Sequence, residues 1–205
     1  SGSQNFGLNG QLQKDITTEI AATIAFSAIE NNYKIGVIFF SDKIEKVIPP
    51  KKGRKHILHI IRDMLDFQPS SSKTDVSVAL ESLSRLVKGR STTFVLSDFY
   101  THNNFEKALS ISSKRHDLIA IQVYDKFQEQ LPNVGLIKVV DAESGQESYL
   151  DTANRDVRAA HATAWKHKQE QLNSIFNKAK IDNVSVSTTD DYVTALTKLF
   201  KQRAK

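Results

Sequence analysis

A short apolar run at residues 92–97 ends at an aspartate, Asp98, and constrains the fold more than any other stretch of the chain. Its length, its β-branched and aromatic residues and its polar borders predict a strand that is buried on both faces. Such strands build parallel α/β sheets, in which ligands bind beyond the carboxyl ends of the strands. Asp98 is therefore a candidate site residue. The alternative is that it caps the helix that follows.

The remaining apolar patterns alternate between strands and helices. Further buried strands are predicted at residues 35–40 and 118–123, a last strand at 184–187, and an edge strand at 44–48 that stops at the two prolines. Amphipathic helices are predicted at about 11–30 and 154–180 and around residues 57–65, 79–87, 105–109 and 193–200. A hairpin is predicted at 136–150, with Gly145 in its turn. We therefore expect a single α/β domain over residues 1–205, with a mostly parallel sheet covered by helices on both faces.

Composition narrows the possible classes of protein. The chain has 205 residues, 40% of them hydrophobic and 25% charged, which is typical of one globular domain. It contains no cysteine, which excludes disulfides, thiolate zinc sites and cysteine nucleophiles. No apolar run reaches the ~20 residues that cross a bilayer, and no signal peptide opens the sequence. We expect a cytoplasmic protein that makes no membrane contact of its own.

The net charge of +5 permits an acidic partner but does not require nucleic acid. The basic residues concentrate at 51–56 and 198–205, and we interpret both clusters as solvated helix ends, with an electrostatic contact surface as the alternative. Neither cluster has the interleaved aromatic residues that stack on bases. Nucleic acid is therefore not an expected partner.

Three segments expected at the carboxyl edge of the sheet offer oxygen ligands. They contain Ser1 with Ser3, Thr74 beside Asp75, and Asp98. Magnesium prefers such hard oxygen ligands and retains several waters, so it needs few protein groups. Helix capping is the alternative role for Thr74 and Asp75, and a chain end or tag remnant is the alternative for the two serines.

These segments resemble a known family. Residues 1–3, 73–75 and 96–99 resemble the three segments of the metal-ion-dependent adhesion site (MIDAS) of von Willebrand factor A-like domains. Residues 35–42, 48–53 and 96–99 are similar to an uncharacterised branch, domain of unknown function 58, that is commonly encoded beside MoxR-type AAA+ ATPases in bacteria. The resemblance implies a von Willebrand factor A-like, Rossmann-like fold across nearly the whole chain.

The resemblance also implies the ligands of a magnesium ion. Ser1 and Ser3 would be hydroxyl ligands, Thr74 the ligand of the second loop, and Asp98 the carboxylate, direct or through water. The family's first aspartate would precede Ser1, as would the apolar strand that lies in the middle of the family's sheet. We hypothesise that the domain is truncated at its amino end. We therefore expect this form to hold Mg²⁺ weakly or not at all.

The implied function is binding, without enzymatic activity. A carboxylate from a protein partner would complete the magnesium shell, and a MoxR-type AAA+ ATPase is the leading candidate partner. One alternative is a metal-independent scaffold that uses the hairpin around Gly145 or the basic loop at 51–55. Another is a phosphoryl-transfer enzyme, although the chain has no Gly-x-x-x-x-Gly-Lys-Ser/Thr loop. The histidines do not form a convincing hydrolytic triad with a serine and an acid.

Overall fold

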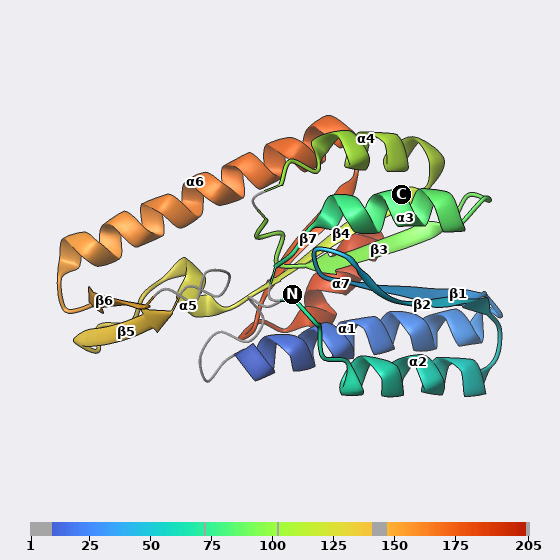
Figure 1. The fold of residues 1–205 in the computed structure, drawn as a ribbon, viewed down its shortest axis with the longest axis horizontal. Helices are drawn as coiled ribbons and strands as arrows, with labels where there is room; N and C mark the ends of the chain where they lie inside the picture. The colour runs from blue at the N-terminus through green and yellow to red at the C-terminus, as the bar shows by residue number, and fades with distance from the viewer. Residues whose placement is uncertain (1–9, 72, 102, 141–146, 204–205) are drawn as a thin grey trace.

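The computed structural model describes residues 10–71, 73–101, 103–140 and 147–203 of the chain. Helices and strands alternate along it, as expected for an α/β protein (Figure 1). The elements in order are α1 (Gly10–Glu30), β1 (Ile35–Phe40), β2 (Ile44–Lys51), α2 (Arg54–Asp66), α3 (Val76–Leu86), β3 (Thr92–Ser97), α4 (Glu106–Arg115), β4 (Asp117–Tyr124), α5 (Lys126–Glu129), β5 (Leu136–Val140), β6 (Glu147–Asp151), α6 (Arg155–Ala179), β7 (Asp182–Ser187) and α7 (Tyr192–Arg203).

Strands β3, β4 and β7 form a parallel three-stranded sheet in that order. Along β4, alternate residues enter two different hydrophobic clusters: Leu118 and Ala120 enter one, and Ile119 and Ile121 the other. Successive side chains of a strand point to opposite faces of its sheet. Both faces of this sheet are therefore packed, which confirms the expectation of helices on both sides.

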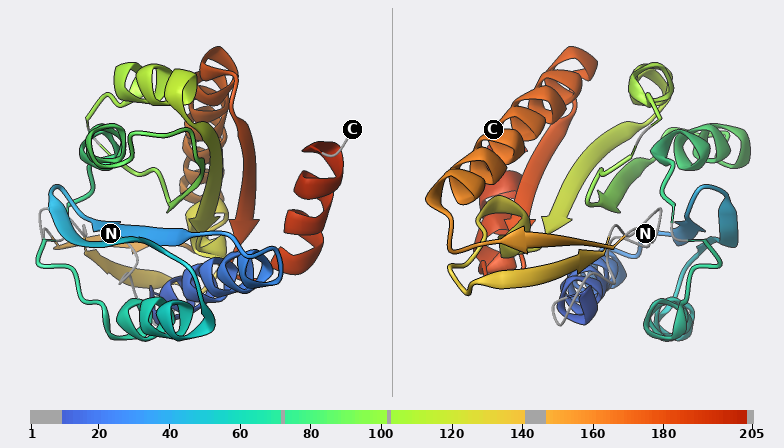
Figure 2. Two further views of the ribbon diagram at one scale, coloured as in Figure 1. Left: turned by 90° about the vertical axis from the view of Figure 1, so that its right-hand side faces the viewer. Right: turned by 60° about the vertical axis from the view of Figure 1, so that its left-hand side comes forward.

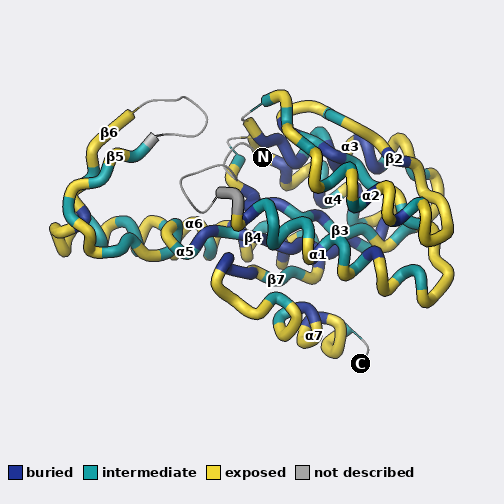
Figure 3. Tube along the Cα trace, turned by 90° about the horizontal axis from the view of Figure 1, so that it is seen from below, coloured by how far each residue is buried: buried dark blue, intermediate teal, exposed yellow. Residues whose placement is uncertain are grey.

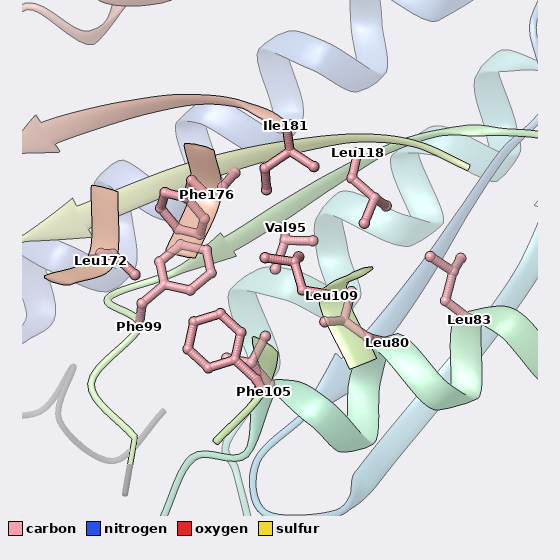
Figure 4. Close-up of a cluster of buried hydrophobic side chains, with 12 residues drawn as sticks. Leu80, Leu83, Val95, Phe99, Phe105, Leu109, Leu118, Leu172, Phe176 and Ile181 are labelled. Atoms are coloured by element: carbon pink, nitrogen blue, oxygen red, sulfur yellow. The ribbon is translucent and has the colours of Figure 1, made fainter. Parts of the chain in front are cut away.

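One cluster lies between the sheet and helices α3, α4 and α6 (Figure 4). Its largest fully buried side chain is Phe176 of α6, whose ring meets that of Phe99 edge-on at 5.1 Å between centroids. Phe105, at the start of α4, lies 6.0 Å from Phe99. Phe99 directly follows Asp98, so this core packs against the loop that carries the candidate carboxylate.

Helix α1 covers the other face and also contacts α2. Ile20 is fully buried in the second cluster, beside residues of β4 and α7. The Gln13 side chain donates a 2.7 Å hydrogen bond to the Val123 carbonyl in β4. The next residue, Lys14, donates a 3.0 Å hydrogen bond to the Leu65 carbonyl in α2. One turn of α1 thus contacts both the parallel sheet and α2.

Strands β1 and β2 form a separate antiparallel pair that packs on α2. Among the described strands, none pairs with the second edge of β1 or with the second edge of β3. Figures 1 and 2 show β1 and β3 running alongside the same helix, α3, without joining into one sheet. The single sheet expected from sequence is therefore present as two pieces.

Strand β2 continues through Pro49 and Pro50 to Lys51, so the prediction that it stops at Pro49 was wrong. The pairing register shifts between Ile35↔Lys51 and Val37↔Ile48, which leaves one extra residue on β2. A bulge tolerates residues that cannot donate to the ladder, and proline is one of them. The prolines therefore mark a bulge in β2.

Gly36 lies opposite this bulge, where the two strands approach closely. A Cβ atom at this position would lie 2.8 Å from the Ile48 carbonyl oxygen and 2.9 Å from the Pro50 nitrogen. Because both neighbours are backbone atoms, they cannot move aside without shifting the strand. We expect Gly36→Ala to lower the free energy of unfolding by about 1–3 kcal/mol, measured by urea denaturation.

Gly89 provides the matched control for this substitution. A Cβ added there meets nothing within 4 Å. Gly89→Ala should therefore change the free energy of unfolding by less than about 1 kcal/mol. If the two substitutions have equal effects, the close approach of β1 and β2 does not require a glycine at position 36.

The hairpin β5–β6 and the long helix α6 confirm the sequence predictions, while the short helix α5 was not anticipated. The turn of the hairpin, including Gly145, lies outside the described residues. Figure 3 shows that most of the hairpin and much of α6 are exposed, in contrast to the buried β4. In the described part of the chain, no helix combines the length and the apolarity that a membrane span requires.

Candidate functional site

Asp98 lies immediately after β3 at the carboxyl edge of the parallel sheet and is buried. Its Oδ1 atom accepts a 3.1 Å hydrogen bond from the Tyr100 backbone N–H. Phe99 has a left-handed backbone with φ of 56°, which turns the chain sharply after the strand. Helix α4 begins only at Glu106, so the alternative that Asp98 caps the next helix was wrong.

Gln122 of β4 holds the backbone at Asp98 in place. Its Nε2 atom donates a 3.2 Å hydrogen bond to the Asp98 carbonyl, and its Oε1 atom accepts a 2.8 Å hydrogen bond from Ser185 of β7. Ser97, Gln122 and Ser185 occupy one register position across the three strands. A buried polar group must be hydrogen-bonded, so this row fixes the loop after β3. The sequence signal for Gln122 was a polar residue inside an apolar run.

Asp75 caps helix α3, as one of the two sequence interpretations proposed. Its Oδ1 atom accepts hydrogen bonds from the Ser77 backbone N–H at 2.8 Å and from the Ser77 hydroxyl. Its Oδ2 atom accepts a 2.6 Å hydrogen bond from Asn103. Burial by itself raises the pKa of Asp75, but the hydrogen bonds from Ser77 and Asn103 outweigh it and leave the pKa below the usual value.

Thr74 is buried, and hydrogen bonds around it join three loops. The Thr101 hydroxyl, in the loop after Asp98, donates a 2.8 Å hydrogen bond to the Thr74 carbonyl. The Asp75 backbone N–H donates a 2.9 Å hydrogen bond to the carbonyl of Ser41, just after β1. The carboxyl ends of β1 and β3 and the start of α3 therefore meet, as the sequence predicted for the loops of Thr74 and Asp98.

Glu45 ties the serine-rich loop before Thr74 to the β1–β2 turn. One of its carboxylate oxygens accepts hydrogen bonds from the Ser41 hydroxyl at 2.7 Å and from the Ser70 hydroxyl at 2.8 Å. The bonds from Ser41 and then Ser70 lower the pKa of Glu45. Glu45 was not predicted as a site residue, because in the sequence it is only one polar position of an alternating strand.

The chemistry of these loops fits a hard cation such as Mg²⁺. Thr74 offers a hydroxyl and Asp98 a carboxylate, while Ser1 and Ser3 lie outside the described residues. In residues 10–71, 73–101, 103–140 and 147–203, no three His, Cys, Asp or Glu side chains form a group suited to a metal. A cation at this edge would therefore need hydroxyl ligands, and Mg²⁺ accepts them.

A second polar pair lies at the opposite edge of the sheet. The Ser91 hydroxyl and Nδ1 of His116 are 3.0 Å apart, although the sequence suggested no partner for this histidine. His116 is 2% exposed, and burial, with the nearby Arg115 charge, lowers its pKa. Its Nε2 atom is buried and has no hydrogen-bond partner among the described residues. The pair has no acid on its second nitrogen and no access for a substrate, so we assign it a packing role.

The fold and this edge define the class: an α/β protein with a parallel sheet whose carboxyl-edge loops carry hydroxyl and carboxylate groups. The chain belongs to DUF58, a family of proteins of unknown function, whose family model matches residues 1–171.

Curated relatives come from mycobacteria. The chain is 30% identical over 168 residues to an uncharacterised protein of Mycobacterium tuberculosis, covering 80% of this chain and 53% of that protein. An uncharacterised protein of Mycobacterium avium is 25% identical over 162 residues, covering 77% of this chain and 94% of that protein. The chain thus spans about half the length of the first of these relatives.

Two solved structures share the fold. A conserved hypothetical protein, BatB, from Bacteroides thetaiotaomicron superposes with a TM-score of 0.54 at 14% identity, covering 91% of this chain and 88% of that chain. An aerotolerance-related membrane protein from Bacteroides fragilis superposes with a TM-score of 0.55 at 15% identity, covering 90% and 88%. At these identities the likeness concerns the fold alone.

Proposed function

We propose that this protein is a non-enzymatic protein-binding module of the von Willebrand factor A type. Ser1, Ser3, Thr74 and Asp98 would hold Mg²⁺ at the carboxyl edge of the sheet. When bound, the ion supplies an open coordination position for a carboxylate of the partner. The observation that carries the proposal is the hydrogen-bonded junction at Thr74, because it brings two of these ligand loops to one place.

The same junction explains why the loops can act as a rigid platform. Asp75 caps α3 and accepts a hydrogen bond from Asn103, and Gln122 donates a hydrogen bond to the Asp98 carbonyl. These two residues fix the loops, and in this proposal they are not ligands of the ion. Capping and ligation are thereby divided between neighbours: Asp75 caps the helix, and Thr74 is left to offer its hydroxyl. Ligands fixed in this way lose little conformational freedom when a partner binds.

We propose further that one more parallel strand, from chain upstream of Ser1, fits between β1 and β3. Both strands have an unpaired edge among the described strands, and exposed ladder groups are costly and prone to pairing. The domain over residues 1–205 would then be an amino-terminally truncated form of the family's domain. A longer chain that includes such a strand should bind Mg²⁺ more tightly than residues 1–205, measured by calorimetric titration.

The leading partner in this proposal is a MoxR-type AAA+ ATPase in the cytoplasm. In a pull-down with the longer chain, we expect capture of a MoxR-type AAA+ ATPase in the presence of Mg²⁺ and a loss of capture in EDTA. Asp98→Ala should reduce the capture in Mg²⁺ by about tenfold or more, because the ion loses a carboxylate ligand. The readout is the amount of ATPase retained at equal bait.

Asp42→Ala is the matched control for this experiment. Asp42 follows β1 as Asp98 follows β3, but it is exposed and lies outside the proposed ligand set. It should retain capture in Mg²⁺. If Asp98→Ala binds as well as the unaltered chain, the metal has no part in recognition, and the alternative of a metal-independent scaffold takes its place.

One observation favours that scaffold alternative. The β5–β6 hairpin exposes two large side chains, with Leu136 68% and Tyr149 71% accessible. Exposed apolar groups of this kind often mark contact surfaces. Substituting both by serine should leave Mg²⁺-dependent capture unchanged under the first proposal and should abolish capture under the scaffold reading.

A further inference from the structure

We propose that the amino edge of the two sheets docks onto an anionic lipid surface. By the amino edge we mean the ends at which β1, β3, β4 and β7 begin; β1 and β3 begin on the right of Figure 1, and β7 begins higher and nearer the middle of that view, where α6 ends. This surface lies opposite the Thr74 junction and is independent of the proposed metal site. The proposal replaces the expectation that this chain makes no membrane contact.

A basic residue precedes each of these four strands. Lys34 lies before β1, Arg90 before β3, Arg115 before β4 and Lys180 before β7, and all four are exposed. The starts of parallel strands share one edge of a sheet, and the junction at Thr74 places the carboxyl ends of β1 and β3 together at the other edge. The four positive charges therefore lie on the same side of the molecule.

An acidic residue follows each of the same strands. Asp42 follows β1, Asp98 follows β3, Asp125 follows β4 and Asp190 follows β7. Lys43 and Lys126 lie beside two of these acids, so the charges at the carboxyl edge largely cancel, whereas basic residues predominate at the amino edge. Such a difference between the edges orients a protein in the field of a charged surface, with the amino edge toward a negative one.

The segment 51–55 adds further charge to the amino edge. Lys51 pairs with Ile35, the first residue of β1, and His56 contacts the Ile35 carbonyl at 2.9 Å. Lys51, Lys52, Arg54 and Lys55 are all exposed. Within the described part of the chain, none of these four side chains forms an ion pair, so their charge is available to a partner.

The acids at this edge do little to cancel that charge. Asp117 and Asp182, which begin β4 and β7, are both bound by Arg203 of α7. The hydrogen bond that Arg203 donates to Asp117, together with the negative charges of Asp117 and Asp182, raises the pKa of Arg203. Glu30, at the end of α1, is a further exposed acid at this edge. The basic residues before the strands and in 51–55 outnumber it.

Two exposed apolar side chains accompany the basic residues. Tyr33, in the turn between α1 and β1, is 62% exposed, and Leu86, the last residue of α3, is 54% exposed. Both elements run into the amino edge. An amphipathic tyrosine and a leucine beside lysines and arginines suit the boundary between lipid head groups and acyl chains.

A lipid bilayer fits these features better than nucleic acid or an acidic protein. The charges are spread over the starts of four strands and a helix rather than along one helix or one groove, so they match a broad surface. Single-stranded nucleic acid would call for several aromatic side chains on which successive bases stack, whereas the α1–β1 turn offers one, Tyr33. The apolar side chain of Leu86 could not bind a phosphate backbone.

The test uses co-sedimentation of residues 1–205 with vesicles. We expect binding to vesicles of phosphatidylglycerol mixed with phosphatidylcholine, no binding to phosphatidylcholine alone, and weaker binding as salt is raised. The triple variant Lys51→Gln, Lys52→Gln, Lys55→Gln should lose affinity by a factor on the order of 100. Tyr33→Ser with Leu86→Ser should weaken binding several-fold without changing its salt dependence.

The control variant carries the same change in charge elsewhere. Lys73→Gln, Arg155→Gln, Lys166→Gln alters three exposed basic residues away from the amino edge and should keep vesicle affinity within about twofold. Thermal unfolding will verify that all variants are folded. Failure to bind phosphatidylglycerol vesicles would overturn the proposal, as would equal loss in the control variant. Tighter binding to duplex DNA or to polyglutamate than to the vesicles would overturn it in favour of that partner.

Discussion

Replacing Phe176 by alanine should lower the free energy of unfolding by about 3–5 kcal/mol, the largest effect we expect of any single substitution. The Phe176 side chain is 2% exposed and lies in the cluster beneath α3, α4 and α6. Alanine would leave a cavity and would remove the edge-on contact with Phe99. Urea denaturation followed by circular dichroism measures the change.

Phe26→Ala is the matched control for Phe176→Ala. Phe26 also lies on a long helix, but it is 44% exposed. Its replacement should alter the free energy of unfolding by less than about 1 kcal/mol. Because Phe99 follows Asp98, the Phe176 variant should also raise hydrogen exchange at the Tyr100 amide, which the Asp98 carboxylate binds. Similar losses for both variants would contradict the assignment of Phe176 to the core.

Asp75→Ala should lower the free energy of unfolding by about 2–3 kcal/mol at neutral pH. The substitution removes the cap of α3 and leaves the Asn103 amide without its acceptor. The N-cap of α6, Asn154, caps its helix without a bond to any other loop in the part of the chain that the structure describes, so Asn154→Ala should cost only about 1 kcal/mol. The difference between the two variants measures the contribution of the bond between loops.

The cost of Asp75→Ala should depend on pH. The folded pKa of Asp75 lies below its usual value of 3.8, so its ionised form stabilises the fold above that pH. The stabilisation is lost as pH falls through the folded pKa. The difference in unfolding free energy between the unaltered chain and the variant should therefore be constant near neutral pH and shrink below pH 3.8. A difference that grows on acidification would contradict the ionised state of Asp75.

Much of the fold was predictable from hydrophobic periodicity. Helices α1 and α6 span the expected residues, because long amphipathic patterns specify a helix with little ambiguity. Strand β4 was recognised as buried because it is almost uninterrupted in apolar residues. The extension of β2 through Pro49 and Pro50 was not predictable, since the bulge that accommodates the prolines depends on the register with β1.

The candidate site was predictable in part. Asp75 and Asp98 stood out because each follows or precedes a clear element, and the hydrogen bonds at Thr74 place their loops together. Gln122 and Glu45 were missed because their roles depend on partners that are distant in sequence, Asp98 and Ser70. Local patterns cannot reveal bonds across a sheet. The positions of Ser1 and Ser3 remain a prediction.

The contacts of α1 have a consequence for how the molecule transmits force. Gln13 is bonded to the parallel sheet and the adjacent Lys14 to the helix under the antiparallel pair. Since no ladder among the described strands joins those two parts, this turn of α1 and the junction at Thr74 are two of the places that connect them. A shift of β1 and β2 relative to the parallel sheet would therefore disturb the hydrogen bonds of Gln13 and Lys14 as well as those at Thr74.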